Sequence, residues 1–284
     1  MDVNSELSPI GVFDSGVGGL SVLRAIRQQM PSQPVIFLAD QAHVPYGPRD
    51  LQEVRSFAEH ITRFLLAGGA RMVVVACNAA SAAALYSLRS TFPEIPFVGM
   101  EPAVKPAAEK TASGVVGVLA TPATFQGALY ASVVDRFAQG VRILQDTCPG
   151  LVAEIEAGNL QGPSTRAILE KALKPMLAQG IDTVVLGCTH YPFVIPLIQE
   201  IVGPGVRVID PAPAVARQVS RQLIVHGWAA SGLQPGALQI YTSASPQKLA
   251  QLVPMMLGED EPVRQVLWKN GSLLAANDGE STEI

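Results

Sequence analysis

Two short apolar segments that each end in a cysteine constrain the fold of this chain more than any other feature. MVVVAC (72–77) and TVVLGC (183–188) are rich in β-branched residues, as expected for buried parallel strands. The first is followed by AAALYSLR (82–89), which has a helical pattern. In α/β proteins, ligands bind where strands end and loops begin. The two segments therefore predict a parallel α/β architecture with a thiol at each of two such positions.

Further strands alternate with helical segments along the chain. This alternation predicts an α/β protein with mostly parallel sheets flanked by helices. The additional strands are expected at 35–40, 96–100, 115–121 and 206–210, and the main helices at 20–30, 51–69, 165–180 and 214–227.

An internal repeat relates the two halves of the chain. Aligning GVFDSGVGG (11–19) with GVLATPATF (117–125) brings the two cysteine-ending strands into correspondence. It also places VIFLAD, which ends at Asp40, near VRILQD, which ends at Asp146. We interpret the repeat as two similar α/β lobes related by a pseudo-twofold axis, with the active site between them. The competing interpretation is that any α/β protein has strands at comparable spacing.

The repeat also predicts where the chain divides. Pro102 and Pro211 occupy matching positions at the end of each half, so the chain is expected to cross between lobes near both. The expected division is 1–100 plus 211–268 for the first lobe, 101–210 for the second, and 269–284 for a flexible tail of small and acidic residues.

Composition excludes several classes of function. The chain has 284 residues, of which 48% are hydrophobic and 15% charged, so it can bury a large core. A formal net charge of −4 provides no basic surface for nucleic acid, and no run of about 20 apolar residues predicts a membrane span. Three cysteines argue against a disulfide framework and for free thiols in a reducing, cytoplasmic compartment. Small metabolites or proteins are the expected partners.

The paired cysteines suit one particular chemistry. Each thiol is expected near the first turn of a helix, where backbone N–H groups and the macrodipole favour the thiolate. On opposite sides of a ligand, one group can remove a proton from carbon while the other returns a proton to the opposite face, which inverts a stereocentre. A single cysteine would more simply be a small buried hydrophobe. The matched pair favours catalysis.

Five motifs make the resemblance to a known family specific. They are similar to successive motifs of the glutamate racemase family, over residues of about 10 to 215. The resemblance implies two α/β domains with the active site between them, and interconversion of L- and D-glutamate without a cofactor. It also implies a supply of D-glutamate for bacterial peptidoglycan. The motifs are GVFDSGVGGLSVL (11–23), ADQAHVPYG (39–47), ACNAASAA (76–83), CPGLVAEIEAG (148–158) and LGCTHYPF (186–193).

The resemblance assigns roles residue by residue. It implies that Cys77 acts on the D-enantiomer and Cys188 on the L-enantiomer. Asp14 and His190 would assist, one near each thiol, and Glu156 would be a further acidic residue of the site. Substrate contacts are implied for Asp14, Ser15, Pro45, Tyr46, Gly47, Asn78, Thr121, Thr124 and Thr189, with Ala79 at the remaining position.

The chain departs from the family's pattern at three of these motif positions. Ala79 replaces the usual threonine, which removes a hydroxyl expected to touch the substrate. Gln41 and His43 stand where threonine and arginine are common. These departures affect affinity and substrate choice more than the type of reaction.

The sequence leaves non-catalytic interpretations open for three of the implied site residues. In those interpretations, Asp14 satisfies backbone groups in a glycine-rich turn, His190 is a buried structural histidine, and Glu156 is a solvated charge. The alternative functions are a related racemase acting on aspartate or hydantoins, and a non-catalytic two-lobed protein that binds an amino acid. A thiol-alkylation assay with glutamate protection distinguishes the second of these.

No cofactor or metal is expected, because no lysine lies in a pyridoxal-binding signature and metal-ligating residues are not clustered. Glutamate is the expected small-molecule partner, with no membrane and no direct nucleic acid. Members of the family are often homodimers, and some relatives are credited with binding DNA gyrase. The sequence itself does not address either property.

Overall fold

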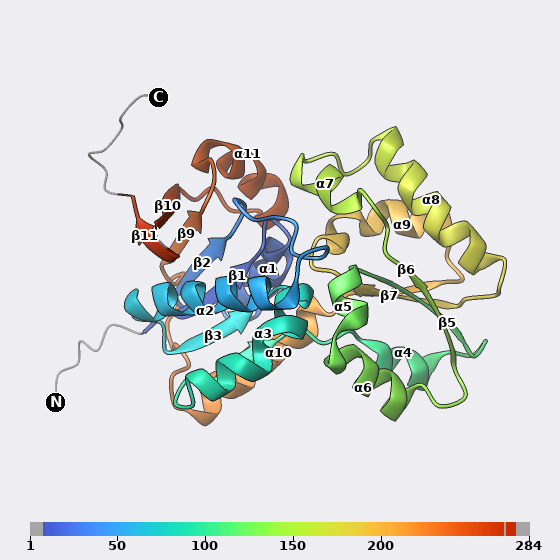
Figure 1. Ribbon diagram of the computed structural model, residues 1–284, viewed down its shortest axis with the longest axis horizontal. Helices are drawn as coiled ribbons and strands as arrows, with labels where there is room; N and C mark the ends of the chain where they lie inside the picture. The colour runs from blue at the N-terminus through green and yellow to red at the C-terminus, as the bar shows by residue number, and fades with distance from the viewer. Residues whose placement is uncertain (1–7, 270, 277–284) are drawn as a thin grey trace.

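Two mainly parallel sheets organise the computed structural model, which describes residues 8–269 and 271–276 (Figure 1). The first sheet contains β1 (Ile10–Asp14), β2 (Val35–Ala39), β3 (Met72–Val75), β4 (Phe97–Gly99), β9 (Leu238–Thr242), β10 (Val263–Lys269) and β11 (Ser272–Ala275). The second sheet contains β5 (Val115–Ala120), β6 (Arg142–Asp146), β7 (Thr183–Gly187) and β8 (Arg207–Ile209).

The two sheets share one strand order over four strands. The order is β2-β1-β3-β4 in the first sheet and β6-β5-β7-β8 in the second, and all of these strands are parallel. This confirms that the repeat in the sequence is a repeat of topology. The first sheet adds β9, β10 and β11 beyond β2. We call the first sheet with its helices the first lobe, and the second sheet with its helices the second lobe.

Strand register shows which residues of the repeat correspond. Phe13 pairs with Val75, and Leu119 pairs with Leu186. Each cysteine lies two residues beyond the paired residue of its strand, so Cys77 and Cys188 occupy equivalent positions. Asp40 and Asp146 also correspond to within two residues, because Leu38 and Asp146 are the residues that occupy equivalent register positions.

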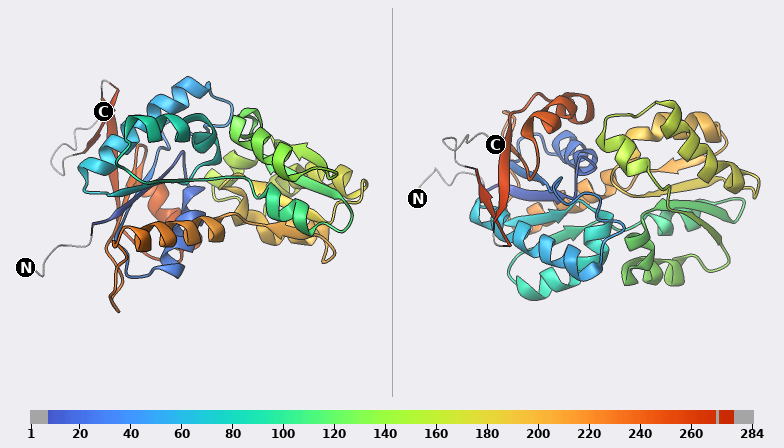
Figure 2. Two further views of the ribbon diagram at one scale, coloured as in Figure 1. Left: turned by 90° about the horizontal axis from the view of Figure 1, so that it is seen from below. Right: turned by 45° about the horizontal axis from the view of Figure 1, so that its top comes forward.

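Helices cover both faces of each sheet (Figure 2). In the first lobe, alternate residues of β1 point to opposite sides: Val12 packs with α1 residues such as Leu23, and Phe13 packs with α2 residues such as Ile61. The helices of the first lobe are α1 (Gly19–Gln29), α2 (Leu51–Ala67), α3 (Asn78–Thr91), α10 (Ala212–Val225) and α11 (Pro246–Leu257).

The second lobe repeats this layered arrangement. Val118 of β5 packs with α4 and α6, whereas its neighbour Leu119 faces the apolar cluster that includes Leu173 of α8. The same cluster contains Leu20 of α1, so the apolar core is continuous between the lobes. The helices here are α4 (Val104–Lys110), α5 (Pro122–Gln126), α6 (Ala128–Phe137), α7 (Leu151–Glu156), α8 (Pro163–Leu177), α9 (Ile195–Val202) and the 3₁₀ turn η1 (Tyr191–Val194).

The expectation of a flexible tail from residue 269 is wrong for the part that the structure describes. Lys269 ends β10, and β11 pairs antiparallel with β10 through Trp268 and Leu273. Leu273 is buried in the same apolar cluster as Val266, and this burial stabilises the edge strand. Residues 270 and 277–284 lie outside the described residues. Strands before position 100 and after position 211 belong to the first sheet, and the strands between these positions belong to the second. The domain limits at these two positions remain a proposal.

None of the described helices combines the length and apolar composition that a membrane span requires.

Candidate active site

A small pocket between the lobes is lined by both thiols. Cys77 lies just beyond β3 and caps the N-terminus of α3, and Cys188 lies just beyond β7. The two thiols therefore come from equivalent ends of strands in different sheets and face one space. The remaining lining residues are Ser15, Pro45, Tyr46, Gly47, Asn78, Ala79, Thr121, Val152, Thr189 and His190.

Three expected site residues stand behind this lining. Asp14 is fully buried under Ser15, and Thr124 bonds Thr121 through their hydroxyls at 3.0 Å. Glu156 lies behind His190 and lines a neighbouring hollow. Val152 was missed from the sequence, although it precedes Glu156 by four residues on α7 and therefore shares its helix face.

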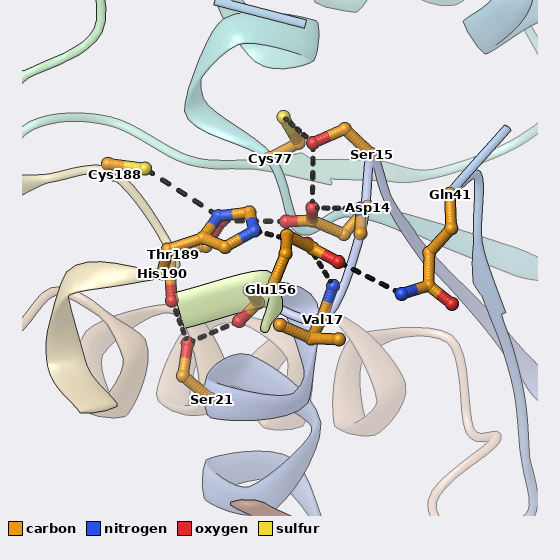
Figure 3. Close-up of polar contacts among 12 residues, drawn as sticks. Asp14, Ser15, Val17, Ser21, Gln41, Cys77, Glu156, Cys188, Thr189 and His190 are labelled. Carbon is orange, nitrogen blue, oxygen red and sulfur yellow. Dashed lines mark hydrogen bonds and ion pairs between the residues drawn. The ribbon is translucent and has the colours of Figure 1, made fainter. Parts of the chain in front are cut away.

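Ser15 connects the Cys77 thiol to the Asp14 carboxylate through two hydrogen bonds. The Cys77 thiol donates to Ser15 Oγ at 3.8 Å, and the Ser15 hydroxyl donates to Asp14 Oδ1 at 3.1 Å (Figure 3). The Ala80 N–H donates to Cys77 Sγ at 3.5 Å, as expected at a helix N-terminus. Burial, followed by the charge of Asp14, nevertheless raises the pKa of Cys77 above its usual value. The expected helix-terminus preference for the thiolate is outweighed, and Cys77 is a neutral thiol at pH 7.

Asp14 joins the two lobes. Its Oδ2 accepts a 2.7 Å hydrogen bond from the Thr189 hydroxyl of the second lobe, and its Oδ1 accepts one of 2.8 Å from the Gly16 N–H. Burial raises the pKa of Asp14 from 3.8 to about 6, although His190 and Thr189 act in the opposite direction. The carboxyl therefore does more than satisfy the glycine turn, because it also accepts a hydrogen bond from the opposite lobe.

Cys188 is instead paired with an imidazole. His190 places Nδ1 at 3.7 Å from Cys188 Sγ and Nε2 at 2.6 Å from Glu156 Oε1 (Figure 3). Burial by itself would lower the pKa of His190, but its contacts with Cys188 and Glu156 raise the pKa well above the usual value. Burial would raise the pKa of Glu156, yet hydrogen bonds from His190, Gln41 and a backbone N–H lower it. The result is a buried imidazolium–carboxylate pair beside Cys188.

Glycines 16 and 18 allow this close approach of the second lobe. A Cβ at Gly16 would collide with the Glu156 carboxylate, and a Cβ at Gly18 would collide with the His190 ring. Two glycines of the GVGG sequence therefore serve contact between the lobes.

Asn78 carries the unpaired polar atoms of the pocket. Neither its amide nitrogen nor its amide oxygen has a hydrogen-bond partner among the described residues, although both atoms are buried. Leaving such groups unsatisfied costs about 1–3 kcal/mol, so the side chain is arranged for a polar ligand. Tyr46 also lines the pocket, but its hydroxyl donates to Asp40 Oδ2 at 2.6 Å, which leaves its ring to contact the ligand. No group of three or more potential ligands among the described residues could hold a metal ion.

Comparisons with known proteins agree with this geometry. A model of the Asp/Glu/Hydantoin racemase family matches residues 10–219. A glutamate racemase from Pseudomonas paraeruginosa is 51% identical over 91% of this chain and 97% of its own length. A crystal structure of a glutamate racemase isoform from Bacillus anthracis has a TM-score of 0.82 and 31% identity, and covers 93% of this chain and 98% of its own. Escherichia coli glutamate racemase, solved with L-glutamate and the activator UDP-MurNAc-ala, has a TM-score of 0.80 and 31% identity, and covers 94% of this chain and 100% of its own. The chain therefore belongs to the Asp/Glu/hydantoin racemase family and is a member of its glutamate racemases.

Proposed function

We propose that this protein interconverts L- and D-glutamate by proton transfer between the substrate and two thiols, without a cofactor. One observation carries the proposal. Two cysteines at equivalent strand ends of two sheets line a single pocket, and each has its own polar partner. The E. coli relative solved with L-glutamate supports the substrate class.

The two thiols have different polar partners, and this difference indicates which thiol acts as base and which as acid for each enantiomer of glutamate. The His190 imidazolium faces Cys188, so it balances negative charge on that sulfur. The raised pKa keeps Cys77 protonated. We therefore assign the role of base to Cys188 and the role of acid to Cys77 in the turnover of L-glutamate.

Turnover of L-glutamate begins with the Cys188 thiolate taking the proton from the α-carbon. The electron pair left on carbon is delocalised into the α-carboxylate and accepts a proton from the Cys77 thiol on the opposite face. The product is D-glutamate, with Cys188 now a thiol and Cys77 a thiolate. Asn78 and the Thr189 and Thr121 hydroxyls line the same pocket and are suited to orienting the substrate's carboxylates.

Asp14 is connected to Cys77 through the Ser15 hydroxyl. The Cys77 thiol donates to Ser15 and the Ser15 hydroxyl donates to Asp14, so two hydrogen bonds connect the thiol to the carboxyl. The pKa of Asp14 is about 6 and that of Cys77 is raised above its usual value, so proton transfer from the thiol to the carboxylate is uphill and its return to a Cys77 thiolate is favoured. Cys77 becomes the base for D-glutamate when it gives its proton to carbon during turnover of L-glutamate.

The cellular role that we propose is the supply of D-glutamate for peptidoglycan in the cytoplasm. The described cysteines are free, as a reducing compartment requires. Homodimer formation stays an expectation from the resemblance, which size-exclusion chromatography would test; the sequence does not predict gyrase binding.

The test is proton transfer in D₂O with cysteine variants. Cys77→Ala and Cys188→Ala should each reduce the rate of inversion in both directions by at least about 10³-fold, because each inversion needs one base and one acid. Cys77→Ala should still exchange the α-proton of L-glutamate, and Cys188→Ala that of D-glutamate, measured by NMR. Cys148→Ala, which lacks a place in the pocket, should racemise like the parent. Near-parent racemisation by either active-site variant would rule out one thiol for each face.

Turnover of aspartate should be measured beside that of glutamate. Ala79 lines the pocket where the family usually has threonine, so it is the position that keeps the aspartate alternative open. A higher kcat/KM for aspartate than for glutamate would overturn the proposed substrate.

A further inference from the structure

Gln41 of the first lobe binds the carboxylate of Glu156, which pairs with His190 beside Cys188 in the second lobe. Its Nε2 donates to Glu156 Oε2 at 2.9 Å, and its Oε1 accepts from the Thr242 hydroxyl at 2.9 Å. Figure 3 shows Gln41 reaching Glu156 from the side away from His190. Glu156 belongs to α7 of the second lobe, whereas Gln41 and Thr242 follow or end strands of the first lobe.

The hydrogen bonds determine the orientation of the Gln41 amide. Glu156 has a lowered pKa and is ionised, so it only accepts, and the NH₂ group must face it. Thr242 Oγ1 accepts the Ala244 N–H at 3.2 Å, so its own proton is available for Gln41 Oε1. Thr242 is fully buried. The amide is therefore held at both ends by groups that fit only one of its two flips.

Gln41 in turn fixes the rotation of the Glu156 carboxylate. Oε1 of Glu156 is shared by His190 Nε2 at 2.6 Å and the Val17 N–H at 2.8 Å. Oε2 accepts from Gln41. Loss of the bond to Oε2 would free the carboxylate to rotate away from His190, and the imidazole that faces Cys188 would lose its orientation.

We propose that Gln41 is a positioning residue that orients Glu156 and His190 for proton transfer by Cys188. The inference rests on the proposed function and extends it to residues outside the expected site. Gln41 is not among the catalytic or substrate-contacting positions that the resemblance implies, and Thr242 lies beyond residues 10–219 matched by the family model.

The effect is confined to one thiol. No hydrogen bond among the described residues joins Gln41 to Cys77, Ser15 or Asp14. Removing the hydrogen bonds of Gln41 should therefore slow proton transfer by Cys188 and leave the rate of proton transfer by Cys77 unchanged. A general loss of structure would slow both.

The test compares Gln41→Met with the parent enzyme, using α-deuterated L- and D-glutamate. Methionine has a similar volume and removes both hydrogen bonds. We expect kcat to fall about tenfold, in line with loss of one hydrogen bond to a charged group. The primary isotope effect on L-glutamate should rise, because removal of its α-proton by Cys188 becomes rate-limiting. The isotope effect on D-glutamate should fall, because the later protonation by Cys188 limits that direction.

Two further variants separate positioning from folding. Thr242→Val is isosteric and removes the anchor of Gln41 together with the acceptor of the Ala244 N–H, so it should move both isotope effects in the same directions by a smaller amount. Gln139→Met changes an exposed glutamine next to the end of α6 and should match the parent. Melting temperatures identify any variant that is misfolded.

Unchanged rates in Gln41→Met, or equal slowing with unchanged isotope effects in Gln41→Met and Thr242→Val, would overturn the inference and leave the proposed function intact. A parent protein that does not racemise glutamate would overturn both.

Discussion

Asp14→Asn is a substitution for which the structure provides both a sign and a magnitude for the change in stability. Asp14 is completely buried, and this burial raises its pKa from 3.8 to about 6. Each pKa unit corresponds to about 1.4 kcal/mol. The ionised carboxylate therefore costs the folded state about 3 kcal/mol at pH 8, compared with a neutral group at the same position.

Asparagine fits the surroundings of Asp14. Its amide oxygen can accept from the Gly16 N–H and the Ser15 hydroxyl, which bond Asp14 Oδ1 at 2.8 and 3.1 Å. Its NH₂ group can donate to Thr189 Oγ1, because a hydroxyl accepts as readily as it donates. The substitution therefore removes the buried charge while the three hydrogen bonds are retained.

The pH dependence follows from the raised pKa. The folded state binds the Asp14 proton more tightly than the unfolded chain does, so the parent loses stability as the pH rises from about 4 to about 6. The variant lacks this loss. It should be more stable than the parent by up to about 3 kcal/mol at pH 8, and equally stable at pH 4. Its racemase activity should fall by at least about 10²-fold, because Ser15 no longer connects Cys77 to a carboxyl group.

Urea denaturation at pH 4, 6 and 8 measures this difference directly. Asp135→Asn, an exposed position on α6, serves as the control and should show no gain that depends on pH. The reasoning is refuted if Asp14→Asn is no more stable than the parent at pH 8, or if its advantage is the same at pH 4 and pH 8.

Three further predictions concern the pocket and its supports. Ala79→Thr should lower the KM for glutamate about tenfold or more by restoring one hydrogen bond to a charged group; no change, or a preference for aspartate, would mean that the pocket is organised differently. Gly18 has a helical backbone, φ −52° and ψ −40°, so the methyl of Gly18→Ala acts by displacing His190 and the Thr189 hydroxyl and not by straining the backbone. Steady-state kinetics should show a kcat at least about 10²-fold lower with little change in melting temperature. Burial would raise the pKa of Asp40, but hydrogen bonds from His43 and other donors lower it below its usual value. Ionised Asp40 therefore stabilises the fold above pH 4, and this stabilisation is lost as the pH falls through the lowered pKa. Asp40→Asn should reduce the free energy of unfolding by about 2–4 kcal/mol at pH 7 and shift the fluorescence of Trp268, whose indole N–H donates to Asp40 at 2.8 Å; unchanged stability would contradict this role.

The sequence by itself was sufficient for most of the fold. Runs such as MVVV (72–75) and TVVLG (183–187) have one interpretation, because a continuous β-branched segment between turn residues is buried on both faces of a sheet. The equivalent positions of Cys77 and Cys188 could also be inferred, since a strand repeat keeps its register when loop lengths change. Strands β9 and β10 could not be inferred, because LQIYT (238–242) and VRQVLWK (263–269) mix polar and apolar residues and are only partly buried.

The electrostatics of the site depended on tertiary structure. A sequence pattern does not show that burial raises the pKa of Asp14, nor that Glu156 and His190 form a buried ion pair, because both effects depend on what surrounds each group in space. The same holds for Gln41, which is 115 positions before Glu156 and 201 before Thr242 in the chain. Local patterns in a sequence reflect backbone periodicity over a few residues, whereas a hydrogen bond across the lobes exists only after both sheets have formed and packed together.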